Sequence, residues 1–189
     1  MTTPRLAVGD VAPPLELTTL AGAPISVPDP AQLVNLQFRR FAGCPICNLH
    51  LRTIARRVDE LRTAGVREVA LFHSTPESMA PFQGDLPFDV VADPERHAYQ
   101  AYAVAGSLRS VLDPRAWPAF VRGALARHPS SSTRGEGGHT GLPADFLVAP
   151  DGRLVAVKYG SHADDQWSVD ELLERVAAAQ RPSPPPTAR

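Results

Sequence analysis

The stretch Phe38–Cys47 reads FRRFAGCPIC and contains both cysteines of the chain. The run that leads into it, LVNLQF (Leu33–Phe38), is short and apolar, which indicates a buried strand. Pro45 suits the first position of a helix, so Cys44 is expected to be the N-cap of that helix. The sequence therefore predicts a buried strand that runs directly into a helix beginning at a cysteine pair.

An amphipathic helix is predicted after the cysteines. Apolar residues recur there at spacings of three and four, and the pattern ends near Gly65, a residue typical of helix ends. The members of this apolar stripe are Cys47, Leu51, Ile54, Val58 and Leu61. Cys47 thus begins the buried stripe, whereas Cys44 is expected at the mouth of the helix, where solvent can reach it.

Strand and helix signals alternate along the rest of the chain. The segments are a hairpin at 15–27, strands at 66–74 and 88–93, a helix opened by Asp93-Pro94-Glu95, a closing hairpin at 144–160 and a final helix opened by the capping box Ser168–Glu171. This order of elements predicts an α/β sheet flanked by helices.

Two segments fall outside this alternation. Residues 107–140 contain one short helix signal at Asp113-Pro114 and then a Ser/Gly-rich stretch, which is typical of an insertion with a flexible loop. Residues 181–189 read RPSPPPTAR and are expected to form a disordered tail. The sequence therefore predicts a single domain over residues 1–180, with an insertion at about 107–140.

Composition restricts the classes of partner. The net charge is −1 and the arginines are scattered, which argues against nucleic-acid binding. No apolar run reaches the roughly 18 residues of a membrane-spanning helix. The first residues lack a basic start followed by an apolar run, so we expect no signal peptide and a cytoplasmic location. In that compartment a C-x-x-C pair is more often catalytic or metal-binding than structural.

The spacing C-x-x-C fits three kinds of site. A redox-active dithiol is the favoured interpretation, and two unreactive buried cysteines are the plainest alternative. A metal site could take Cys44, Cys47 and His50 as ligands, but a closed zinc site needs four. His50 is therefore interpreted as a surface side chain, and no metal or other cofactor is expected.

Three segments carry a resemblance to a known family. VGDVAPPLELTTLAG (8–22), FDVVADPERHAYQAYAV (88–104) and PADFLVAPDGRLV (143–155) are similar to segments of alkyl hydroperoxide reductase and thiol-specific antioxidant proteins, the peroxiredoxin-like branch of the thioredoxin-fold superfamily. The resemblance covers about Leu6 to Ala179, apart from the insertion. It implies a thioredoxin-like fold, with a central mixed sheet flanked by helices and an N-terminal hairpin.

The cysteine loop departs from the pattern of that family. Peroxiredoxins resemble one another in a P-x-x-x-T-x-x-C loop; with Cys47 as its last residue, Cys44 takes the Thr position and Arg40 the Pro position. Before the closing hairpin, where the family has an Arg, the chain reads GLPADF (141–146), and Pro143 resembles the cis-proline of thioredoxins. The chain is thus most similar to the peroxiredoxin-like subgroup with a C-x-x-C motif, which implies a thiol oxidoreductase.

The chemistry assigns roles to the residues around the pair. A helix N-terminus favours an anion, so Cys44 is predicted to be the attacking thiolate and Cys47, three residues on, the resolving thiol. Strand alternation directs Arg39 and Arg40 to opposite faces, so one of them is expected near the sulfur. The family resemblance favours Arg40, because it aligns with a position of the peroxiredoxin loop. His73 lies at the end of a predicted strand and is a candidate base or proton donor for Cys44.

The predicted function is a thiol–disulfide oxidoreductase that reduces disulfides or peroxides, with electrons returned by a thioredoxin-type or small-thiol reductant. A first alternative is a peroxidase in which Cys47 attacks the peroxide and Cys44 resolves. A second, non-enzymatic alternative is a redox sensor or scaffold switched by the Cys44–Cys47 disulfide. A homodimer is a possible assembly.

Overall fold

The computed structural model describes residues 4–104 and 141–181. The predicted insertion and all but the first residue of the predicted tail lie outside these ranges. No helix in the described ranges is both long enough and apolar enough to cross a membrane.

A five-stranded mixed sheet forms the centre, in the order β5-β4-β3-β6-β7. Its strands are β3 (Leu33–Phe38), β4 (Val66–Phe72), β5 (Asp89–Ala92), β6 (Ala144–Val148) and β7 (Leu154–Tyr159). The first three are parallel to one another, whereas β6 pairs antiparallel with both β3 and β7. Because β3 is the central strand, all six of its residues are buried, which confirms the buried strand predicted before the cysteines.

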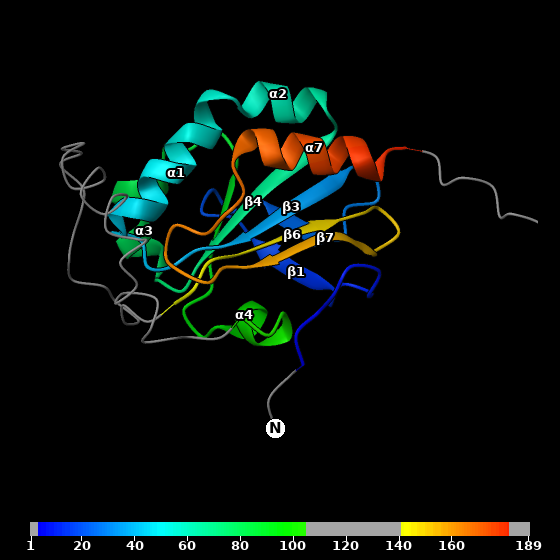
Figure 1. Cartoon of the computed structure of the whole chain (residues 1–189). Coiled ribbons are helices and arrows are strands. Elements are labelled where there is room, and N and C mark those ends of the chain that lie inside the picture. Colours follow the sequence, from blue (N-terminus) through cyan, green and yellow to red (C-terminus); the bar gives the residue numbers. More distant parts are fainter. Residues whose placement is uncertain (1–3, 105–140, 182–189) are drawn as a thin grey trace, which may run out of the picture.

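Helices cover one face of this sheet, and the N-terminal hairpin covers the other together with a short helix (Figure 1). The first layer consists of α1 (Pro45–Arg56), α2 (Val58–Thr63) and α7 (Val169–Ala179); the second contains α4 (His97–Ala101) and the hairpin β1 (Leu15–Thr18) and β2 (Pro24–Val27). A separate apolar cluster lies on each face. The predicted α/β class and the predicted hairpin are confirmed.

The prediction of one continuous helix from Pro45 to Gly65 was wrong, because the structure has two helices there, α1 and α2. Arg57 interrupts it with φ −121° and ψ 16°, and its N–H donates to the Ile54 carbonyl at 2.9 Å. The apolar stripe is nevertheless buried on both halves, from Cys47 to Leu61. The periodicity predicted the buried face correctly but carried no sign of the bend.

A further helix, α3 (Pro76–Gln83), was not predicted. Pro81 inside it and Gly84 at its end indicate a loop, which is why the sequence pattern missed it. The signal that could have identified it is Thr75 as N-cap followed by Pro76 at the first position and an acidic residue.

The capping box of α7 is confirmed, because the Glu171 N–H donates to Ser168 Oγ at 3.2 Å and the Ser168 N–H donates to Glu171 Oε2 at 2.8 Å.

Candidate active site

The two cysteines lie where β3 gives way to α1, as predicted. Cys44 is the N-cap of α1 in an extended conformation, and Pro45 occupies the first turn. The two sulfur atoms are 3.0 Å apart, and neither is in a disulfide. This separation allows a hydrogen bond between a thiol and a thiolate.

Solvent access to Cys44 was predicted wrongly, because Cys44 is only 1% exposed and Cys47 is fully buried. The loop before α1 is itself buried. The Cys44 N–H donates to the Phe41 carbonyl at 3.0 Å, and the Ala42 N–H donates to Ser74 Oγ at 3.0 Å. These bonds hold Phe41 and Ala42 in the same buried cluster as the two cysteines.

Arg40 is the arginine that contacts the sulfur, as predicted. Its NH1 group donates to Cys44 Sγ at 3.8 Å. Arg39 points to the other side of the strand end, where its NH2 group forms a 2.6 Å ion pair with Asp145 Oδ1. Both arginines are buried, so their charges act on the cysteines with little screening.

The two thiols differ in acidity, in the order opposite to the predicted one. Burial raises the pKa of Cys44 well above its usual value, and the hydrogen bond and charge of Cys47 raise it further. Burial also opposes ionisation of Cys47, but the hydrogen bond from Cys44, the charge and backbone N–H of Arg40 and the charge of Arg39 lower the pKa of Cys47 to about 7. Cys47 is therefore the thiol that ionises first.

His73 lies directly after β4 and close to Arg40. A Cβ atom placed on Gly141 would lie 3.4 Å from His73 Nε2 and 3.6 Å from Arg40 Cγ, so both side chains line the same small space. Burial, together with the charges of Arg96 and Arg40, lowers the pKa of His73 to about 4. Among the residues that the structure describes, neither ring nitrogen has a hydrogen-bond partner. The imidazole is thus neutral near neutral pH and able to donate or accept, and its role toward Cys44 stays a prediction.

Pro143 precedes β6, at the place where the sequence resembles the cis-proline of thioredoxins but leaves the isomer of the peptide bond open. Among the described peptide bonds the cis one is Val27–Pro28, and Leu142–Pro143 is trans. The Pro143 carbonyl accepts a hydrogen bond from the Gly160 N–H at 2.8 Å. This bond continues the β6–β7 ladder by one more pair, which fixes the segment in an extended conformation.

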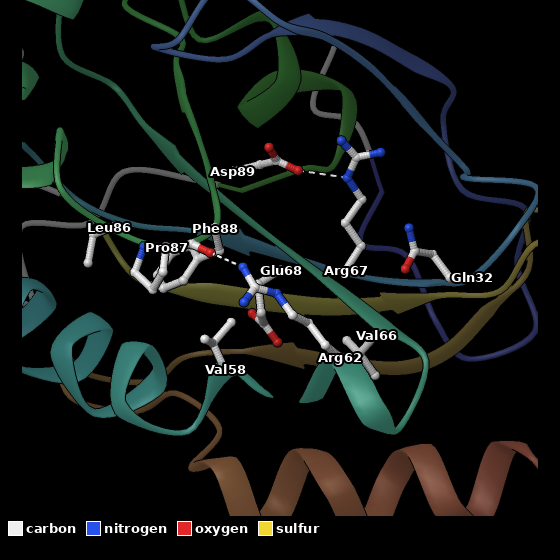
Figure 2. A pocket seen from close by; sticks show the side chains of 10 residues that line it. All are labelled: Gln32, Val58, Arg62, Val66, Arg67, Glu68, Leu86, Pro87, Phe88 and Asp89. Atoms are coloured by element: carbon white, nitrogen blue, oxygen red, sulfur yellow. Dashed lines mark hydrogen bonds and ion pairs between the residues drawn. The ribbon is translucent and has the colours of Figure 1, made fainter. Parts of the chain in front are cut away.

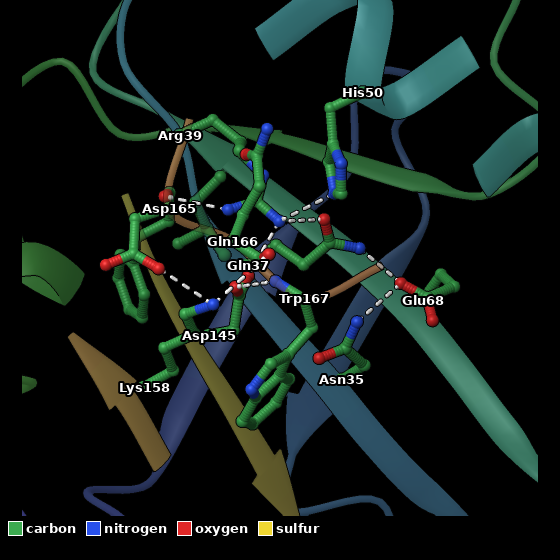
Figure 3. Close-up of polar contacts among 12 residues, drawn as sticks. Asn35, Gln37, Arg39, His50, Glu68, Asp145, Lys158, Asp165, Gln166 and Trp167 are labelled. Carbon is green, nitrogen blue, oxygen red and sulfur yellow. Dashed lines mark hydrogen bonds and ion pairs between the residues drawn. The ribbon is translucent and has the colours of Figure 1, made fainter. Parts of the chain in front are cut away.

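A buried polar network beneath α1 was not predicted (Figure 3). Glu68 Oε2 on β4 accepts hydrogen bonds from Asn35 Nδ2 at 2.9 Å and from the Gln37 amide on β3. The Gln37 side-chain oxygen in turn accepts from Arg39. The available signal was a polar residue at every second position, 35, 37 and 39, of an otherwise apolar strand.

Asp145 on β6 completes this network on its far side. It forms the ion pair with Arg39, and its other oxygen accepts from the Trp167 N–H at 3.0 Å.

His50, predicted to be a surface residue, is half-buried, with Nε2 3.4 Å from Arg39 NH2. Burial and the charges of Arg39 and Lys158 hold the pKa of His50 well below its usual value. Within the described ranges no group of His, Cys, Asp and Glu is arranged to hold a metal.

A mixed sheet with a cysteine pair at the start of the helix after its central strand defines a thioredoxin-like redox protein. A model of the AhpC/TSA family matches residues 8–157, and the chain belongs to that family. Membership supports a thiol-dependent redox function. A search of the curated proteins found no match.

Solved structures show the same fold at low sequence identity. The peroxidoxin BcpB from Mycobacterium tuberculosis is 15% identical over 92% of this chain and 98% of its own, with a TM-score of 0.67. AhpC from the same organism is 17% identical over 94% of each chain, with a TM-score of 0.67. A putative thiol:disulfide interchange protein DsbE from Chlorobium tepidum is 20% identical over 92% of this chain and 98% of its own, with a TM-score of 0.59. These likenesses confirm the predicted thioredoxin-like fold.

Proposed function

We propose that this protein is a thiol-dependent peroxidase in which Cys47 attacks the peroxide and Cys44 resolves the product. The observation that carries the proposal is the difference between the two thiols. The pKa of Cys47 is lowered to about 7, whereas the pKa of Cys44 is raised. Since the thiolate is the nucleophile, Cys47 is the better attacking group near neutral pH.

The burial of the pair favours a small substrate. With exposed fractions of 1% and 0%, neither sulfur can meet the disulfide of a folded protein without a movement of the loop before α1. A peroxide needs only enough room for its two oxygen atoms. Arg40, in contact with Cys44 Sγ and acting on Cys47 through its charge, would stabilise the anion that leaves when the O–O bond breaks.

The reaction balances within the pair. The Cys47 thiolate attacks one peroxide oxygen, the O–O bond breaks, and the leaving alkoxide or hydroxide takes up a proton. The Cys44 thiol then attacks the Cys47 sulfenic acid, water leaves and a disulfide forms. The negative charge of Cys47 raises the pKa of Cys44, and this effect ends when Cys47 becomes a sulfenic acid. The resolving thiol is therefore more acidic at the step in which it attacks. A thioredoxin-type or small-thiol reductant would return the electrons.

A second candidate is thiol–disulfide exchange that begins at Cys44. The observation in its favour is the direct contact of Arg40 NH1 with Cys44 Sγ, at the N-cap position of α1. This function requires the loop before α1 to move, because Cys44 is buried.

Intact-mass kinetics distinguish the two candidates. Reduced protein is mixed with hydrogen peroxide or with a small disulfide, and the loss of two hydrogens that marks disulfide closure is followed. The peroxidase predicts faster closure with peroxide, together with a sulfenic acid on Cys47 in Cys44→Ser. Closure only with the disulfide, and a mixed disulfide on Cys44 in Cys47→Ser, would contradict the peroxidase and support the exchange. Slow closure with both oxidants would leave the redox sensor or an unreactive pair.

A further inference from the structure

Glu68 is a buried acid that none of the steps above uses. Glu68 is 3% exposed and lies on β4, beneath the helical layer. Asn35 and Gln37 donate hydrogen bonds to Oε2, whereas Oε1 has no hydrogen-bond partner within residues 4–104 and 141–181. Burial raises the pKa of Glu68 to about 7, against the lowering effect of these two amides and of Arg39. A carboxyl group placed in this way can change its charge near neutral pH.

Arg39 connects Glu68 to the thiols. The Gln37 side chain donates to Glu68 and accepts from Arg39, so one amide bridges the acid and the guanidinium. The charge of Arg39 favours ionisation both of Glu68 and of Cys47. Arg39 already has a fixed counter-ion in Asp145, at 2.6 Å and with both side chains 1% exposed. The two titratable acids therefore share Arg39, whose charge Asp145 already balances, while Cys47 also has the charge of Arg40.

One additional buried anion can be accommodated in this layer by hydrogen bonds, but a second is costly because a buried charge without a counter-ion is strongly unfavourable. We propose that Glu68 and Cys47 alternate in carrying that anion, so that Glu68 is protonated while Cys47 is a thiolate and ionises when the thiolate is consumed. This inference rests on the proposed function, because turnover is what removes the thiolate. Glu68 acts through Arg39 and does not touch the peroxide.

The proton balance of the reaction agrees with this exchange. Oxidation of one thiolate and one thiol by a peroxide takes up one proton, since an alcohol and a water leave while the disulfide forms. The Glu68 carboxylic acid releases one proton. With both changes together, the reactants are thiolate, thiol, peroxide and carboxylic acid, and the products are disulfide, alcohol, water and carboxylate. The total charge buried in this layer is then the same before and after turnover.

Glu68 also has a route by which its proton can exchange with solvent. It lines a cavity of about 390 Å³ at the start of β4 (Figure 2). The other charged residues that line this cavity are Arg62, Arg67 and Asp89. Arg62 forms an ion pair with Asp59, and Arg67 forms ion pairs with Asp29 and Asp89. These arginines are already paired, which leaves Arg39 as the charge that links Glu68 to the thiol site.

Infrared difference spectroscopy tests the proposal directly. Reduced protein labelled with ¹³C-glutamate is oxidised with diamide near neutral pH, which closes the pair without any peroxide chemistry. The expected result is loss of one protonated-carboxyl C=O band that carries the isotope shift of glutamate. The band should be absent from Glu68→Gln and unchanged in Glu60→Gln, which alters an exposed carboxylate on α2. An unchanged band, or no such band in either redox state, would overturn the proposal, and this outcome depends only on the wild type.

The reduction potential gives an independent readout that a merely structural role would not move. For a two-electron couple each proton contributes about 30 mV per pH unit. Above the pKa of about 7 of Cys47, two protons should still accompany reduction in the wild type, giving a slope of about 59 mV per pH unit, whereas Glu68→Gln should give about 30 mV because only Cys44 takes up a proton. Equal slopes contradict the alternation while leaving the peroxidase intact. A pair that neither diamide nor hydrogen peroxide can close contradicts both.

Discussion

Arg39 and Arg40 are neighbours in the sequence, but they contact different groups because the end of a strand directs their side chains to opposite sides. Arg40 contacts Cys44 Sγ and lies beside His73. Arg39 is buried between Asp145 and Gln37 and acts on Cys47 only through its charge. At the scale of single residues, the acidity of Cys47 comes from these charges and from the Cys44 hydrogen bond, all opposing the effect of burial.

Arg40→Gln is expected to raise the pKa of Cys47 by roughly one unit, because it removes a positive charge that favours the thiolate. Thiolate absorbance measured against pH gives the midpoint. Arg52→Gln, which alters an arginine paired with Asp85 at the surface, is the matched control and should leave the midpoint in place. An unchanged midpoint in Arg40→Gln would show that the Cys44 hydrogen bond and Arg39 are sufficient.

Asp145→Ala is expected to lower the free energy of unfolding by about 3–5 kcal/mol, because it leaves the buried charge of Arg39 without its counter-ion. Urea denaturation measures the change. Asp59→Ala breaks an exposed ion pair with Arg62 and should cost less than about 1 kcal/mol. Similar values for the two variants would mean that water reaches Arg39.

At the scale of elements, the site depends on how the helices are started and interrupted. The bend at Arg57 allows α2 to lie along β4 while α1 keeps Cys47, Leu51 and Ile54 in the core. Helix α7 packs on the same face through its buried residues. The Trp167 N–H just before α7 donates to Asp145, so the position of this helix is linked to the ion pair that holds Arg39.

Ser168→Ala is expected to destabilise the protein by about 1 kcal/mol, because the capping box at the start of α7 loses the oxygen that accepts the Glu171 N–H. The measurement is a denaturation midpoint at constant m-value. Ser168→Thr retains an oxygen at the N-cap and should restore most of the loss. Equal destabilisation by both variants would point to the shape of the side chain and not to the cap.

At the scale of the whole molecule, the sheet separates two apolar clusters, and the polar network is confined to the helical side. Two buried titratable groups, His73 and Glu68, make the stability of the fold depend on pH. His73 is neutral in the fold with its pKa lowered to about 4, so its contribution to stability is lost as pH falls from its ordinary value toward 4. Glu68 acts in the opposite direction.

The folded pKa of Glu68 is about 7, against an ordinary value of 4.5. The native state thus binds this proton more tightly than the unfolded chain, and the contribution is fully present below pH 4.5 and is lost as pH rises through about 7. Relative to Glu68→Gln, the reduced wild type should lose roughly 3 kcal/mol across this window. Urea denaturation of both proteins at a series of pH values checks it. Parallel curves would contradict a buried acid.

The sequence by itself determined the order of the elements, the buried strand before the cysteines, the apolar stripe of α1 and α2, and the capping box of α7. Each of these is encoded within a few neighbouring residues, as periodicity or as a cap. The placement of Cys44 at the N-cap followed from the same local rules, whereas the placement of Arg40 near the sulfur followed from the family resemblance. These rules did not predict the bend at Arg57, because the apolar stripe continues through it. They did not predict helix α3, because Pro81 within it indicates a loop.

Only the tertiary structure decided the surroundings of the two cysteines. Burial of Cys44, the lower pKa of Cys47 and the trans bond before Pro143 depend on segments that pack together from distant parts of the chain. Arg39 and Asp145 are 106 positions apart, and no local pattern pairs them. The acidity of a thiol is set by the burial and the charges around it in space, which the order of residues along the chain does not reveal.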